Sequence, residues 1–388
     1  MWRLRSVVEL RLEFVCLALQ EGSNVSDLCR RFGISRKTGY KWLRRGEEQG
    51  ACLSDRSRRP DKSPKRTAAA VETKIVSLRG AHPAWGARKL RRRLSDVGEE
   101  GLPAHSTITE ILRRNGCLDA AEAAKHKAFI RFEHPRPNGL WQMDFKGHVE
   151  MRAGGRCHPL TVLDDHSRFA LCIAACANEQ TQTVQDRLTE TFQRYGLPER
   201  MTMDNGSPWG DGPYGGGFTP LTVWLMRLGV RCGHSRPYHP QTQGKDERMH
   251  RSMHAEAMQK VREDLEDWQA AFDAWRVVYN TQRPHQALDY DVPAQRYQPS
   301  PRPWTGRLIE PEYGPDDFER RVQKNGWFSF KGHTLKVSKA LASQRIALRP
   351  TADDGVWDVI FVAQRISQVD LRDALRDTKT VNHSSEPG

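Results

Sequence analysis

The stretch that decides the fold reads LWQMDFK and covers residues 140–146. Upstream of it, apolar residues recur every three or four positions, as in helices. From Leu140 onward they alternate with polar residues, as in a strand that buries one face. Trp141, Met143 and Phe145 form the apolar side, and Asp144 belongs to the polar side. This change of period predicts that an α/β domain starts here.

The residues downstream continue the α/β pattern, and we assign them to one domain over 136–298. The pattern predicts strands at 160–163, 169–177, 200–203 and 230–232 and helices at 183–195 and 221–228. It also predicts one long helix from Lys245 to about Tyr279.

Beyond the proline-rich segment 299–303 the composition changes again. Five short apolar runs at close spacing predict strands and therefore a small β-barrel or sandwich, which we place at 318–372. The last dozen residues are polar and are expected to be disordered.

The first fifty residues have the pattern of a helix-turn-helix, and we assign residues 1–50 to such a domain. Gly33 suits a left-handed turn between two helices, and Ser35 is a natural N-cap for the second. The second helix is basic and aromatic, and we expect five of its residues to face DNA: Arg36, Lys37, Tyr40, Lys41 and Arg44.

A second helical unit is expected at 66–116, after a basic linker at 54–65. Val71, Ile75 and Leu78 form one apolar stripe, and a second helix starts near Trp85. Thr107 followed by Glu110 resembles a capping box ahead of a third helix. We interpret this unit as a second helix-turn-helix.

Basic residues are concentrated in the first third of the chain. Residues 1–134 contain 28 Lys and Arg against 16 Asp and Glu, whereas residues 135–388 contain 33 against 32. A surplus that is localised in this way predicts a polyanion-binding region, so we expect double-stranded DNA as the partner.

The composition excludes several classes of protein. No run of about 18 apolar residues occurs in the 388, and the N-terminus lacks the apolar stretch of a secretory signal, so we expect a cytoplasmic protein without membrane contact. The eight cysteines include no CxxC pair, which favours reduced thiols and argues against a structural zinc site.

Three acids stand out by their position in these elements. Asp144 lies on the first strand of the α/β domain, Asp204 ends a later strand, and Glu247 lies at the start of the long helix. Carboxylates without His or Cys neighbours are hard oxygen ligands, which suit Mg²⁺ or Mn²⁺. Two such ions can activate an attacking oxygen and stabilise a leaving oxygen at phosphorus. A single acid on a strand is usually solvated or caps a turn, so the interpretation depends on all three.

With these acids the chain resembles bacterial insertion-sequence transposases that have a DDE triad and a retroviral-integrase-type core. The resemblance spans about residues 10–300. It rests on the segments MDNGS (203–207), PYHPQTQGKDER (237–248), LDDHSR (163–168), YGLP (195–198), RPH (283–285), GISRKTGYKW (33–42) and HPAWGARKL (82–90).

The resemblance implies a ribonuclease H-like fold for the central domain, with Asp144, Asp204 and Glu247 binding two divalent ions. It implies hydrolysis of a phosphodiester at a transposon end and attack of the freed 3′-hydroxyl on target DNA. Lys245 and Arg248 are then expected to hold the DNA backbone near the metals. The DNA would be the terminal inverted repeats and the target, bound by a homo-oligomer at the bacterial nucleoid.

Two features depart from the family pattern. The interval between Asp204 and Glu247 is longer than usual, and we assign the excess to the glycine-rich segment 209–217. Asp246 precedes Glu247, and since helix neighbours point about 100° apart, only one can be a ligand; we choose Glu247. Asp164 and Asp165 are interpreted as turn or hydrogen-bonding acids, with Asp165 as a weak substitute.

Two other functions compete with a transposase. A non-catalytic DNA-binding regulator, or an inactive transposase relic, has no need of the three acids together. A metal nuclease that hydrolyses without joining has no need of two helix-turn-helix units and a β domain.

Overall fold

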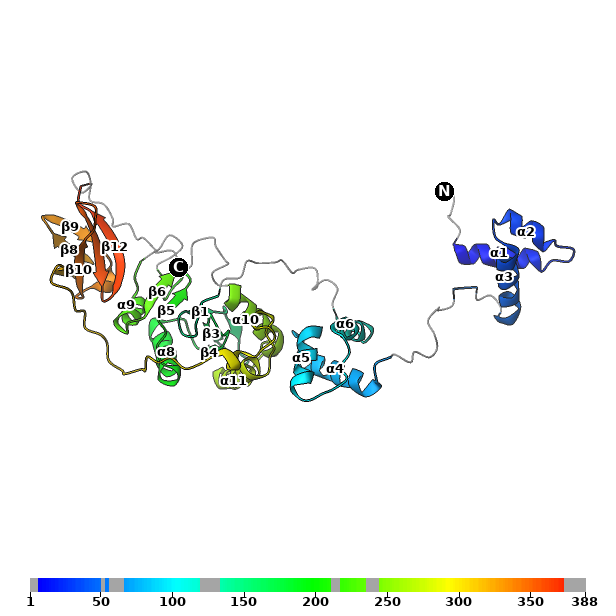
Figure 1. The fold of residues 1–388 in the computed structure, drawn as a ribbon, viewed down its shortest axis with the longest axis horizontal. Helices are drawn as coiled ribbons and strands as arrows, with labels where there is room; N and C mark the ends of the chain where they lie inside the picture. The colour runs from blue at the N-terminus through cyan, green and yellow to red at the C-terminus, as the bar shows by residue number, and fades with distance from the viewer. Residues whose placement is uncertain are drawn as a thin grey trace. The chain divides into compact units, whose positions relative to one another are not determined.

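The structure is a computed structural model that describes residues 6–49, 53–55, 66–118, 133–210, 217–234 and 244–372 (Figure 1). Its contacts divide the chain into two units, Met1–Arg66 and Thr67–Gly388. The expected linker at 54–65, the glycine-rich segment at 209–217 and the C-terminal tail lie largely outside the described residues. Helical units, an α/β core and a small β domain follow one another along the chain, as the sequence predicted.

The described residues of the first unit form three helices, α1 (Val7–Ala18), α2 (Val25–Arg31) and α3 (Arg36–Gln49). They pack around Phe14, Cys29 and Trp42, all of which are buried. Gly33 has a φ of +65°, and the Ser35 hydroxyl accepts a hydrogen bond from the Thr38 amide at 3.2 Å. The turn and cap of the expected helix-turn-helix are therefore confirmed.

The second group of helices comprises α4 (Ala69–Ala81), α5 (Ala87–Asp96) and α6 (His105–Arg114). Ile75, Trp85, Leu90 and Ile111 are among its fully buried residues. The capping box predicted at Thr107 is wrong, because α6 starts two residues earlier, at His105, and has no side-chain cap. The prediction failed because Pro103-Ala104 ends the preceding extended segment, and the helix begins directly after it.

A mixed sheet forms the centre of the molecule's α/β part. Its strands are β1 (Trp141–Phe145), β2 (Val149–Glu150), β3 (Arg156–Asp164), β4 (Ala170–Cys176), β5 (Arg200–Met203) and β6 (Arg231–His234). The order is β2-β3-β1-β5-β6, with β4 on β3. β1 is antiparallel to β3 and parallel to β5, and Trp141 pairs with Met201.

Helices cover the two faces of this sheet. On one face, α8 (Thr181–Tyr195) and α9 (Pro220–Arg227) pack on Trp141 and Met143 of β1. On the other face, α10 (Gly244–Ala257) and α11 (Leu265–Thr281) pack on β3 and β4. Alternation along β1 therefore directs Gln142 and Asp144 toward the side of α10.

The single long helix expected from Lys245 to Tyr279 is wrong. It is divided into α10 and α11, because Asp264 is an N-cap whose carboxylate accepts the amide of Asp267 at 2.9 Å. The break lets α11 turn back, so that both helices cover the same face of the sheet.

The α4–α6 group contacts the α/β core through α5. The Arg93 guanidinium donates to the Gln282 amide oxygen at 3.1 Å, and Arg92 lies 3.4 Å from the Asp291 carboxylate. Val278 of α11 packs against the apolar cluster of the helical group. The end of α11 and the turn after it thus face α5.

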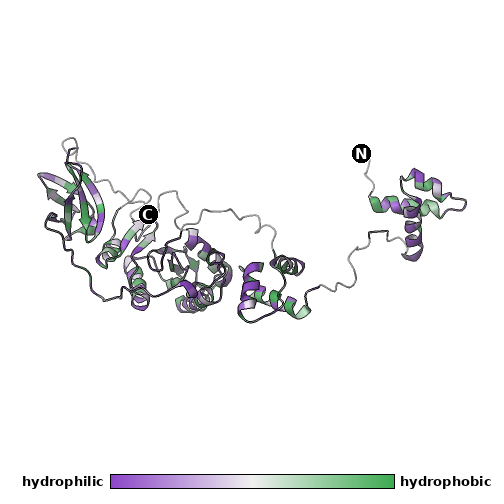
Figure 2. Ribbon diagram, viewed as in Figure 1, coloured by the Kyte–Doolittle hydropathy of each residue, from purple (hydrophilic) through white to green (hydrophobic). Residues whose placement is uncertain are grey.

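The C-terminal domain contains a four-stranded sheet of β7 (Phe318–Arg321), β10 (Arg345–Pro350), β11 (Val356–Phe361) and β12 (Gln364–Asp370). A hairpin of β8 (Trp327–Phe330) and β9 (His333–Lys336) completes it. Figure 2 shows apolar residues alternating with polar ones along these strands. Val223 and Met226 of α9 belong to the same apolar cluster, so this domain packs on the α/β core.

One glutamine continues the edge of the central sheet. The Gln364 amide accepts from the Cys232 N–H at 3.1 Å and donates to the Cys232 carbonyl at 2.9 Å. Cys232 lies on β6, the edge strand, whose free backbone groups need partners. Gln364 therefore supplies them as a neighbouring strand would.

Within the described part of the chain, no helix combines the length and apolar character needed to span a bilayer.

Candidate active site

Two of the three acids are neighbours because their strands are parallel. Asp144 lies on β1, and Asp204 directly follows β5. The register that pairs Gln142 with Thr202, continued by two residues, sets Asp144 beside Asp204. The Thr161 hydroxyl of β3 donates to the Asp144 carbonyl at 3.0 Å and holds the other side of β1.

The third acid is supplied by the first turn of α10, in which Glu247 is exposed. Met249 and Met253, in the following turns, are buried against the sheet and position the helix over it. The start of the helix is thereby placed near the end of β1.

The charges of these acids act on one another. Burial raises the pKa of Asp144 to about 7, and the carboxylates of Asp204 and Glu247 also contribute to this rise. A raised value of this kind means that the charged form of Asp144 is disfavoured, first by burial and then by the neighbouring negative charges. A cation would relieve the repulsion, and hard oxygen donors are what Mg²⁺ prefers.

His250 of α10 also faces Asp144. Its Nδ1 lies 3.8 Å from an Asp144 carboxylate oxygen, and its Nε2 lies 2.8 Å from the Thr161 hydroxyl. The Thr161 proton is donated to the Asp144 carbonyl, so Nε2 is the donor and Nδ1 is bare when the ring is neutral. Burial lowers the pKa of His250 to about 3, which keeps the ring neutral. A bare nitrogen facing a carboxylate also suits a cation between them.

Asp246, which the sequence did not identify as a ligand, is fully buried. Neither of its carboxylate oxygens has a hydrogen-bond partner in the described part of the chain. Burial, followed by repulsion from Asp144 and Asp165, raises its pKa well above the usual value. Its position directly after Lys245 gave no signal of burial, because the apolar spacing of α10 is weak at its start.

The structure gives Lys245 a partner inside the protein. Its ammonium donates to the Asp165 carboxylate, and burial lowers its pKa to about 8. Asp165 also accepts from the Gln142 amide at 2.8 Å and from the His134 backbone at 2.7 Å. Asp164 accepts the amide of Asn138 at 2.7 Å. Both acids are thus hydrogen-bonding residues, as the sequence predicted.

The acids do not form a closed ligand set. Among the described residues, no three His, Cys, Asp or Glu side chains are grouped closely enough to hold a metal ion. One oxygen of Asp204 instead accepts the Gly206 amide at 2.9 Å and the indole N–H of Trp209. The carboxylate oxygens of the three acids suit a divalent ion. Binding one would require Asp204 to give up its hydrogen bonds with Gly206 and Trp209 in exchange for the ion.

The predicted DNA-facing residues of α3 are all exposed, namely Arg36, Lys37, Tyr40, Lys41 and Arg44. Arg44 lies 3.0 Å from Glu48, one turn along the helix. The buried face is formed by Trp42 and Leu43. Arg248, on α10, is exposed as well.

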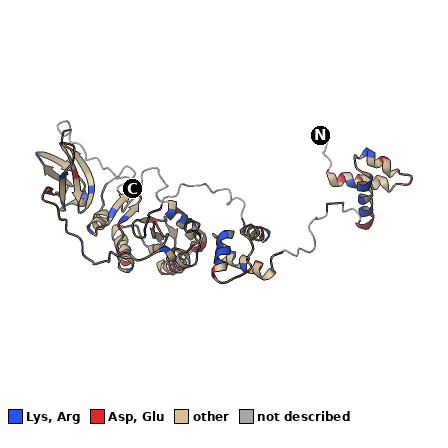
Figure 3. Cartoon of the chain, in the orientation of Figure 1, with Lys and Arg blue, Asp and Glu red and all other residues tan. Residues whose placement is uncertain are grey.

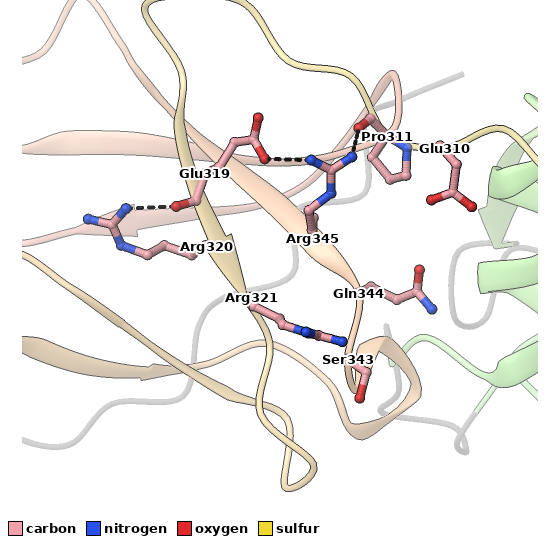
Figure 4. Close-up of a pocket in the computed structure, with 8 residues that line it drawn as sticks. All are labelled: Glu310, Pro311, Glu319, Arg320, Arg321, Ser343, Gln344 and Arg345. Carbon is pink, nitrogen blue, oxygen red and sulfur yellow. Dashed lines mark hydrogen bonds and ion pairs between the residues drawn. The ribbon is translucent and has the colours of Figure 1, made fainter.

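A cavity of about 360 Å³ lies on the β domain, between β7, β10 and the segment before them (Figure 4). One of its three arginines, Arg345, donates to the Glu319 carboxylate at 3.1 Å and to the Pro311 carbonyl at 2.7 Å. None of the three acids lines it. Because the acids lie elsewhere, the cavity is not the chemical site.

Comparisons with protein families agree along the chain. An integrase core domain profile matches residues 134–240 and a second one matches 228–293. The C-terminal domain of IS481 family transposases matches 317–376, a helix-turn-helix domain matches 10–61, and a homeodomain-like domain matches 38–112. The chain has the domains of an insertion-sequence transposase. This transposase is accordingly a polynucleotidyl transferase.

Relatives of the transposase are distant in sequence. It is 22% identical over 363 residues to a putative transposase of insertion sequence IS5376 from Geobacillus stearothermophilus, covering 90% of this chain and 85% of that protein. It is 24% identical over 292 residues to an uncharacterised 31.7 kDa protein of IS407 from Burkholderia multivorans, covering 72% and 92%. The HTLV-2 integrase catalytic core, solved with magnesium, is 12% identical with a TM-score of 0.32, covering 42% and 99%.

Proposed function

We propose that this transposase cuts phosphodiesters at transposon ends and joins the freed 3′-hydroxyl to target DNA, with Asp144, Asp204 and Glu247 as its catalytic acids. The observation that carries the proposal is the parallel register of β1 and β5, which sets Asp144 beside Asp204, with α10 and its Glu247 packed on the same side of the sheet. Carboxylates that meet in this way, within an integrase core, are what a cation-dependent site requires.

The three acids would hold Mg²⁺ or Mn²⁺, two ions per site. Ions bound there supply activation of the attacking oxygen and stabilisation of the leaving oxygen. Glu247 is preferred over Asp246 as the third ligand because it is exposed and can reach an ion that also contacts DNA and water. Asp246, by contrast, is fully buried.

The partner is double-stranded DNA, read first at the terminal inverted repeats. The exposed α3 residues Arg36, Lys37, Tyr40, Lys41 and Arg44 would contact it, as helix-turn-helix recognition helices do. Arg248 would hold the backbone near the acids. Lys245 would do so after exchanging Asp165 for a phosphate.

Joining two ends requires that both be held at once, which favours a homo-oligomer on DNA. The protein would act at the nucleoid in the bacterial cytoplasm.

The experiment uses the inverted repeats that flank the gene, cloned as a pair on a supercoiled plasmid. We expect Mg²⁺-dependent cutting and joining by the wild-type protein and neither by Asp204→Asn, which should still bind the ends in a gel shift. Binding without cutting by both proteins would favour the regulator or relic. Cutting without joining would favour a nuclease.

A further inference from the structure

Figure 3 shows that α5 is the most densely basic helix of the second group, α4–α6. The face of α5 that packs on the core includes Arg93, which donates to the Gln282 amide oxygen at 3.1 Å. Lys89 lies four residues earlier and therefore on the same face of the helix, one turn away. It faces the region of Arg283, the residue after Gln282.

Arg283 fixes the position of α10 at the same place. It donates to Glu256 at 2.9 Å and to the Ser252 hydroxyl at 2.7 Å. Ser252 in turn donates to the carbonyl of Arg248 at 3.2 Å. Lys89 and Arg248 therefore each lie one helical turn from a residue that contacts Gln282 or Arg283, Lys89 on α5 and Arg248 on α10.

Positive charge at this junction exceeds the negative charge available. Glu256 already binds Arg283 and accepts the Trp275 indole N–H at 2.7 Å. In the described part of the chain no hydrogen bond or ion pair reaches the side chain of Lys89 or Arg248. Burial, then repulsion from Arg283 and Arg248, lowers the pKa of Lys89 well below its usual value. An anion bound here would stabilise the charged forms of these side chains.

We propose that Lys89 of α5 and Arg248 of α10 together hold one phosphate of the DNA strand that leads to the acids. The helical group α4–α6 would then contribute directly to the catalytic site. Arg248 is adjacent to Glu247, so the phosphate lies within a few nucleotides of the reacting bond. The inference rests on the proposed function for the identity of the anion.

The test measures binding, in the Asp204→Asn protein, so that its result does not depend on catalysis. The ligand is a duplex of one transposon end, and each phosphate near the cut is replaced in turn by an uncharged methylphosphonate. Lys89→Met and Arg248→Met keep the side-chain stems and hence the packing, and thermal unfolding checks the fold. Lys74→Met, on α4 and paired with Glu99, is the matched control.

We expect one methylphosphonate position to weaken binding about tenfold, and each variant to weaken it by a similar factor. On DNA with the methylphosphonate at that position, Lys89→Met and Arg248→Met should bind as well as the parent protein, because the phosphate charge that the lysine and arginine contact is already absent. The control should keep the wild-type pattern. If Lys89→Met folds normally and remains as sensitive to every position as the parent protein, the proposal is wrong.

Absence of metal-dependent joining by the wild-type protein in the plasmid assay would contradict the proposed function. It would not alter this binding pattern, so the two failures can be told apart.

Discussion

Arg283, in the turn after α11, donates to Glu256 of α10 at 2.9 Å, and both side chains are almost completely buried. The same guanidinium binds Ser252, and Glu256 also accepts from Trp275 of α11. This network joins the two helices that replaced the single predicted one. It therefore fixes the helix that carries Glu247 relative to the sheet that carries Asp144.

Breaking this pair should destabilise the protein strongly. Arg283→Ala leaves the Glu256 charge buried without its partner, which typically costs about 3–5 kcal/mol. Urea unfolding followed by circular dichroism measures the decrease in stability. Arg187→Ala, which breaks an exposed pair with Glu190 on α8, is the control and should cost less than about 1 kcal/mol. Equal decreases in the two variants would show that the buried network is not a structural element.

Glu247 and Asp246 should respond differently to removal of charge. Glu247→Gln removes the third proposed ligand and should abolish joining, whereas Asp246→Asn should retain it. The Asn variant also lacks a buried carboxylate that has no hydrogen-bond partner in the described part of the chain, so its thermal stability should be equal or higher. Strand transfer with a pre-cut end gives the readout. The reverse order of activities would make Asp246 the ligand.

Substitutions on α3 should change how DNA binding depends on salt. A side chain that neutralises one phosphate adds about 0.9 to the slope of log affinity against log salt, so its removal should make the slope shallower by that amount. Arg36→Ala and Lys41→Ala should each weaken binding and show this smaller slope in fluorescence anisotropy. Arg30→Ala on α2, whose guanidinium already binds Asp27, serves as the comparison. A slope that stays at the wild-type value would remove α3 from the interface.

Gln364 should be needed to attach the β domain to the sheet edge. Gln364→Ala leaves the Cys232 N–H and carbonyl without their partners, at a cost of about 1–3 kcal/mol. Limited proteolysis should then cut between the α/β core and the β domain faster. Gln368→Ala, on the exposed side of the same strand, should behave like wild type. If both variants resist proteolysis equally, Gln364 does not hold the domain.

The strand pattern of the core could be predicted because the alternation around Asp144 and the buried runs of β3 and β4 are local. The break before α11 could not, since helical spacing continues through it and only the Asp264 cap reveals it. Burial of Asp246 and the packing of α5 against the turn after α11 depend on contacts between distant segments. The spacing of residues along the chain does not specify such contacts.

The central claim is that Asp204 holds a divalent ion during joining, and metal rescue of Asp204→Cys tests it most directly. A thiolate binds Mg²⁺ poorly and softer ions better. We predict that strand transfer of a pre-cut end by this variant is absent in Mg²⁺ and partly restored in Mn²⁺, whereas Asp204→Asn stays inactive in both. Full activity of the Cys variant in Mg²⁺, or equal inactivity of both variants in both metals despite normal end binding, would contradict the account.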